Sequence, residues 1–252
     1  MKGSRTMAAV ITGAAFVALS GCGGDDSGGG SGDSKPFAGK SADQIAADAV
    51  KATKQADSMH MKGTVQQSAG SSTTVDLSVD NSKNCDGSIQ AEGASADVRN
   101  AKGTFYLRGD EKYWQKALKG QAGGDKIVPK IADKWVKAPA DDTTTKSLCD
   151  KNALMASMDK DTSERKGMKK GSTATVDGNE TIRLTKKTSG GETLTLYVAT
   201  EGKPYILRST STGGKEPNTA TFSDYGKSVS PETPEPGETV DLKKLAAGGQ
   251  KA

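Results

Sequence analysis

The sequence predicts an α+β domain in which helices pack against one face of a single antiparallel β-sheet. After one segment with a helical repeat, the apolar period falls to two residues and stays there for most of the chain. Gly, Ser, Asn and Lys separate these runs, as in consecutive hairpins. Each run has one polar and one apolar side, which is typical of a sheet with one solvated face.

The composition argues against several classes of function. The net charge is only +4 in 252 residues and is dispersed, so we expect no nucleic-acid partner. Hydrophobic residues make up 33% and aromatic residues 4% of the chain, which predicts a modest core. With one His and neither G-x-S-x-G nor H-E-x-x-H, the sequence predicts no metal, no cofactor and no enzyme activity.

The first 22 residues have the pattern of an export signal. Lys2 and Arg5 precede an apolar run, Met7–Leu19, that is too short to span a bilayer. The run leads into Leu19-Ser20-Gly21-Cys22, which matches the bacterial lipobox. The motif implies that residues 1–21 are removed and that Cys22 is acylated, leaving the protein anchored on the outer face of the cell membrane. The alternative is an ordinary secretory signal with a chance Cys.

A tether and a folded domain are predicted to follow. Residues 22–40 are rich in Gly and Ser and should form a flexible linker, residues 41–245 a single domain, and residues 246–252 a frayed tail. The domain begins at Ser41, which forms a capping box with Gln44 at the start of a helix that runs to about Ala56.

The remaining elements follow from the period and the turn residues. Strands are expected at 58–67, 75–80, 85–91, 94–98, 105–107 and 134–137, and then at 172–176, 181–187, 193–199, 205–211 and 219–223. Short helices are expected at 111–119 and 147–158, on either side of a Gly-rich tip, and a Pro-rich arm at 230–237.

Two cysteines remain when Cys22 is assigned to the lipid. Outside the cytoplasm, Cys85 and Cys149 favour a disulfide, which closes a loop of about 65 residues and contributes roughly 4 kcal/mol in the chain-entropy model. Two free buried thiols or a metal pair are the alternatives, although two sulfurs and one distant His do not complete a tetrahedral site.

The chain resembles the actinobacterial lipoproteins of the LppX/LprAFG type, whose fold is like that of LolA and LolB. The resemblance lies in Met61–Val65, Thr104–Gly109 with Tyr113-Trp114, Lys134–Val136, Leu194–Val198 with Gly202–Pro204, and Phe222–Gly226. It implies a strongly curved antiparallel sheet, a half-barrel, with helices packed on its concave face. It also implies an apolar space between sheet and helices that can hold acyl chains.

The resemblance therefore predicts a lipid or glycolipid ligand that is bound or transferred in an apolar cavity. We expect this cavity to be lined by inward-facing residues of the strands: Met59, Met61, Val65, Leu77, Phe105, Leu107 and Leu196. In the alternative, these residues fill a core, and the protein is an envelope interaction or sensor module whose protein partner the sequence does not identify.

Overall fold

The computed structural model describes residues 37–66, 70–138, 147–158 and 166–242. The predicted signal peptide, the lipobox with Cys22, nearly all of the tether and the tail at 246–252 lie outside these residues. Residues 35–252 form a single compact unit. Within the described ranges, no helix is long and apolar enough to cross a membrane.

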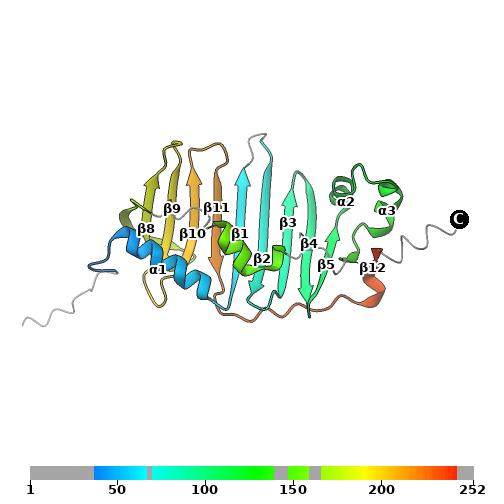
Figure 1. The fold of residues 1–252 in the computed structure, drawn as a ribbon, viewed down its shortest axis with the longest axis horizontal. Coiled ribbons are helices and arrows are strands. Elements are labelled where there is room, and N and C mark those ends of the chain that lie inside the picture. Colours follow the sequence, from blue (N-terminus) through cyan, green and yellow to red (C-terminus); the bar gives the residue numbers. More distant parts are fainter. Residues whose placement is uncertain (1–36, 67–69, 139–146, 159–165, 243–252) are drawn as a thin grey trace, which may run out of the picture. The chain divides into compact units, whose positions relative to one another are not determined.

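The described strands form one twelve-stranded sheet in the order β12-β6-β5-β4-β3-β2-β1-β11-β10-β9-β8-β7. Figure 1 shows this order across the view. The strands are β1 (Ser58–Gln66), β2 (Ser72–Asp80), β3 (Cys85–Ala91), β4 (Ala94–Ala101), β5 (Thr104–Gly109), β6 (Trp135–Lys137), β7 (Lys169–Val176), β8 (Asn179–Lys187), β9 (Thr193–Ala199), β10 (Ile206–Thr212), β11 (Asn218–Ser223) and β12 (Thr239–Asp241).

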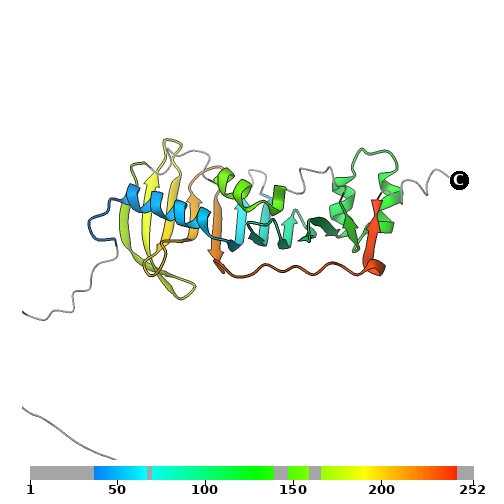
Figure 2. The ribbon, with the colours of Figure 1, turned by 60° about the horizontal axis from the view of Figure 1, so that its bottom comes forward.

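The sheet is curved and does not close on itself (Figure 2). Within the described part, every pair of neighbouring strands is antiparallel except β12 and β6. The α+β half-barrel expected from the sequence and the resemblance is therefore confirmed. The parallel β12–β6 pair was not expected. The Pro-rich arm forms this pair, because it runs from the end of β11 along the strand ends to β6 (Figures 1 and 2). Within the arm, the Glu232 carbonyl accepts a 3.1 Å hydrogen bond from the Arg99 guanidinium.

Helix α1 (Ala42–Gln55) begins at the predicted capping box. The Ser41 hydroxyl accepts from the Gln44 backbone N–H at 3.2 Å, and the Gln44 side chain accepts from the Ser41 N–H at 2.8 Å. The buried face consists mostly of small residues, Ala42, Ile45, Ala46, Ala49, Val50 and Thr53. Small side chains let the helix axis come close to the sheet, where α1 contacts β7, β9 and β10.

A second helical segment is fastened to the sheet by a disulfide. It consists of the 3-10 helix η1 (Ser147–Cys149) and α5 (Lys151–Met158), and Cys149 is bonded to Cys85 on β3 with a Cα–Cα distance of 5.4 Å. Lys151 is 1% exposed, and its ammonium donates to the Lys54 carbonyl at 2.8 Å, near the C-terminal end of α1. Burial lowers the pKa of Lys151 below its ordinary value.

Two further helices lie at the β5 end of the sheet, α2 (Glu111–Ala117) and α3 (Gly124–Ile131), and η3 (Pro236–Glu238) precedes β12. Asp110 caps α2 through the Tyr113 N–H at 2.6 Å. Helix α3 was not predicted, because it is short and carries Pro129 inside a Gly- and Lys-rich segment that has the composition of a loop.

Candidate functional site

The inner face of the sheet consists of rows of side chains that run across the strands, and these rows change in character along the strand direction. One row contains Phe222, Met61 and Leu77, paired in register across β11, β1 and β2. Two residues further along β1, the row is Ala220, Gly63 and Val75. Because alternate residues of a strand share a face, both rows face the same side of the sheet.

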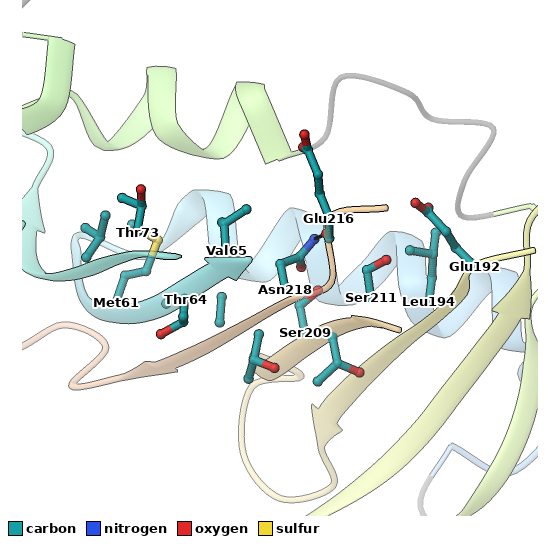
Figure 3. Close-up of a pocket in the computed structure, with 15 residues that line it drawn as sticks. Met61, Thr64, Val65, Thr73, Glu192, Leu194, Ser209, Ser211, Glu216 and Asn218 are labelled. Carbon is teal, nitrogen blue, oxygen red and sulfur yellow. Dashed lines mark hydrogen bonds between the residues drawn. The ribbon is translucent and has the colours of Figure 1, made fainter. Parts of the chain in front are cut away.

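The next row lies at the strand tips and is smaller and more polar. It consists of Leu194, Ser211, Asn218, Val65 and Thr73, which are paired in register from β9 to β2. Figure 3 shows Val65, Ser211 and Leu194 projecting from one side of the strands, whereas Thr64 projects from the other.

A groove of about 500 Å³ lies over the row of Ala220, Gly63 and Val75 and the row at the strand tips. Its lining residues come from five neighbouring strands and the turns that join them: Met61, Gly63, Thr64, Val65, Thr73, Val75, Glu192, Leu194, Ser209, Thr210, Ser211, Glu216, Asn218, Thr219 and Ala220. The hollow exists because Gly63 and Ala220 on its floor carry almost no side chain. The volume is in the range of small-molecule sites.

The groove stays open because α1 covers a different part of the same strands. The Thr53 hydroxyl of α1 accepts the Ile206 N–H at 3.1 Å, so the helix crosses β10 at its first residue. Ser209 and Ser211, which line the groove, lie further along β10. The rows under α1 are therefore filled core, whereas no residue of the described helices lines the groove.

The groove combines an apolar floor with polar side chains. Met61, Val65, Val75 and Leu194 supply apolar surface, and Ser209, Ser211 and Asn218 supply hydroxyl and amide groups. The carboxylates of Glu192 and Glu216 lie on the same side of the sheet (Figure 3). Glu192 packs against Gly214, where an added Cβ would collide with its side chain. Such a surface suits an amphipathic ligand.

Of the seven residues predicted to line a cavity, four lie in the core, two line the groove and one lies beside it. Met59, Leu77 and Phe105 are each 1% exposed and belong, with Leu107, to the filled hydrophobic core. Two residues, Met61 and Val65, line the groove, and Val65 is 41% exposed. Leu196 is partly buried against the core, in the row of Ala220 and Gly63.

Sequence reasoning did not select the polar and the small residues of the groove. It favoured large apolar residues, which a strand buries first, and so passed over Gly63, Ala220 and Ser211. The available signal was the run of small or polar residues at alternate positions of β10 and β11, which leaves the inner face without bulk.

The outer face carries the charged pairs of the sheet. His60 contacts Asp76 through Nε2 at 2.6 Å and the Ser223 hydroxyl through Nδ1 at 3.3 Å. The hydrogen bond with His60 lowers the pKa of Asp76 below its ordinary value, and Lys62 contributes in the same direction. The guanidinium groups of Arg99 and Arg108 both contact the Trp135 ring, at 4.7 and 4.8 Å from its centre.

These outer-face groups are joined to one another in ion pairs. The Arg99 and Arg108 side chains are also bonded to Asp86 and Asp97. Within the described residues, no three His, Cys, Asp or Glu side chains are grouped so that they could hold a metal ion. The groove on the inner face, by contrast, places apolar side chains beside hydroxyl and amide groups.

Comparison with solved structures finds the same architecture in another protein. LprF from Mycobacterium bovis superposes with a TM-score of 0.53 at 17% identity, over 77% of this chain and 96% of LprF. The chain has the LprF fold.

Two other solved structures are less similar. The Mycobacterium tuberculosis lipoprotein LppX gives a TM-score of 0.47 at 12% identity, over 75% of this chain and 96% of LppX. MucB gives 0.37 at 12% identity, over 78% of this chain and 63% of MucB. No protein-family model and no curated protein matches the sequence.

Proposed function

We propose that this chain is an envelope lipoprotein, anchored on the outer face of the membrane through acylated Cys22, which binds or carries a lipid or glycolipid. The observation that carries the binding proposal is the inner-face groove of about 500 Å³, with apolar side chains on its floor and hydroxyl groups beside them. Acyl chains need the first kind of surface, and a polar head or sugar needs the second.

The anchor proposal depends on the lipobox Leu19-Ser20-Gly21-Cys22. The LprF fold supports it, and LppX, a less similar structure, is itself described as a lipoprotein. A Cys22→Ala substitution in the full chain tests it. We expect metabolic labelling with an alkyne fatty acid to mark the wild-type chain and not the variant, and an unlabelled wild-type chain would contradict the anchor.

The binding proposal is tested on residues 35–252, which form one compact unit. After incubation with envelope lipids and removal of detergent, native mass spectrometry should show discrete added mass that organic solvent removes. Ala220→Leu should abolish that mass, because its side chain fills the floor of the groove. Thr221→Leu is the control, since it places the same leucine side chain one residue away on the other face of β11.

The thermal melting temperature of each variant checks that it folds. A wild-type domain that stays free of lipid after incubation would contradict the binding proposal and favour the interaction or sensor alternative. Lipid bound equally by Ala220→Leu would place the ligand elsewhere.

A further inference from the structure

A basic surface lies at the β7 end of the sheet, opposite the end formed by β12. Lys166, Lys169 and Lys187 line a hollow of about 520 Å³ together with Lys186, Gly167, Thr185 and Thr193. All of the lining residues are basic or uncharged. Lys166, Lys169 and Lys187 are exposed, and none of the three forms a salt bridge within the described part of the chain.

The sheet register brings the lysines together. Lys169 on β7 is paired with Thr185 on β8, and Lys187 is paired with Thr193 on β9, so these side chains share the outer face at one end of the three strands. Lysines on an edge strand also protect it from pairing with other chains. That role accounts for Lys169 on the edge strand β7, but not for Lys187, because β8 is paired on both sides.

The point where the chain enters the domain is fastened to the same strand. The Lys170 ammonium donates to the carbonyls of Phe37 and Lys40, at 3.2 and 2.8 Å. Asp43 of α1 accepts the backbone N–H groups of Gly167 and Met168, at 3.0 and 2.9 Å. Figure 1 shows the loop before α1 beside the β8 end of the sheet. The basic surface therefore lies next to the junction with the predicted tether.

We propose that the basic surface docks the domain on the anionic headgroups of the bilayer into which Cys22 inserts. This docking proposal rests on the proposed function, because it assumes that Cys22 anchors the protein. Fourteen residues lie between Cys22 and Phe37, and a flexible linker of that length, as the sequence predicts, has a mean reach of roughly 20 Å. Such a tether holds the surface at an effective concentration in the millimolar range, where a weak electrostatic affinity suffices.

The basic hollow and the groove meet at the start of β9, on opposite faces of the sheet. Thr193 lines the basic hollow, and the next residue along β9, Leu194, lines the groove from the other face. Docking through the lysines therefore leaves the inner-face groove uncovered by the bilayer.

The experiment uses residues 35–252, which lack Cys22 and so bind vesicles only through the folded domain. The probes are vesicles of phosphatidylcholine alone and of phosphatidylcholine with 30% phosphatidylglycerol, at about 0.05 and 0.5 M salt. The test variant is Lys166→Gln/Lys169→Gln/Lys187→Gln. The control is Lys119→Gln/Lys126→Gln/Lys130→Gln, which removes the same charge from exposed lysines around α3.

We expect binding to anionic vesicles only, lost at high salt. Each lysine near an anionic surface contributes about fivefold, so the test variant should bind roughly 100-fold more weakly while the control changes less than threefold. Equal binding of the test variant and wild type, or equal loss in the control, would overturn the proposal. So would binding to both vesicle types, which indicates insertion or lipid uptake instead. Alkyne labelling of Cys22 reports the anchor separately, so failure of docking and failure of anchoring are distinguishable.

Discussion

The inner face of the sheet contains two regions built from the same strands. On β1, Met59 belongs to a core row under the helices, and Val65, six residues further along, belongs to the groove. Their cross-strand partners differ in the same way, since Met59 is paired with Val79 and Val65 with Thr73. One region excludes water and holds the fold together, and the other leaves about 500 Å³ open.

The difference shows how one sheet supports both stability and binding. Curvature gives every strand a concave side, but a groove forms only where side chains are small and no helix lies above them. The Ala220–Gly63–Val75 row supplies the first condition. The contact of Thr53 with Ile206, which keeps α1 at the other end of β10, supplies the second. Substitutions in the two regions should therefore have separate effects.

The largest expected effect on the core region comes from the disulfide that holds the helical cover. The double substitution Cys85→Ser/Cys149→Ser should lower the free energy of unfolding by about 4 kcal/mol. The two cysteines are 64 residues apart, and without the bond the unfolded chain gains the conformational entropy of the opened loop. Urea denaturation followed by circular dichroism measures the change. The register that forms the groove should persist in the folded variant, so loss of lipid binding without unfolding would contradict the separation of the two regions.

A direct contrast between the regions uses two truncations on adjacent strands. Leu77→Ala should cost about 2–5 kcal/mol of unfolding free energy, because Leu77 is 1% exposed and leaves a cavity in the core. Val65→Ala should cost less than about 1 kcal/mol, because Val65 is 41% exposed. Chemical denaturation of both variants measures the two losses of unfolding free energy. Equal losses would show that the groove is packed in solution.

Much of the fold follows from sequence because local signals and burial agree there. The capping box at Ser41 and the alternating runs of β1 to β5 depend on neighbouring residues, and the structure places them as expected. The groove depends on which small residues meet across five strands, and the pairing of Gly63 with Ala220 joins positions 157 residues apart. A separation of 104 residues likewise hides the β12–β6 pair, in which Thr239 is paired with Trp135. Register between distant strands was not available from the pattern.

A smaller effect is expected at the start of α1, the helix whose position limits the groove. Ser41→Ala should lower the free energy of unfolding by about 1 kcal/mol, because it removes the acceptor for the Gln44 N–H. Ser41→Asp restores a capping acceptor and is the matched control. In thermal denaturation, we expect the melting temperature to fall in the order wild type, Asp variant, Ala variant. An Ala variant as stable as wild type would show that packing on β7, β9 and β10 alone holds the helix.

The smallest expected effect lies at Asp76, which projects from the outer face and lines neither the core nor the groove. The pKa of Asp76 is lowered from its ordinary value of 3.8, first by the hydrogen bond with His60 and then by Lys62. A carboxyl with a lowered folded pKa stabilises the protein above its ordinary pKa, and this contribution disappears as the pH falls through the lowered value. Asp76→Asn should therefore lower the melting temperature slightly at pH 7 and leave it unchanged near pH 2.

The pH series for Asp76→Asn has two matched comparisons. Asp125→Asn removes one carboxylate from α3, far along the sheet, and reports the effect of net charge alone. His60→Gln removes the partner that makes the largest contribution to the lowered pKa, and should reproduce most of the loss seen in Asp76→Asn at pH 7. An equal loss at both pH values would assign the effect to packing instead of ionisation. Lipid occupancy should not respond to any of the three variants, because His60 and Asp76 project from the face of the sheet opposite the groove.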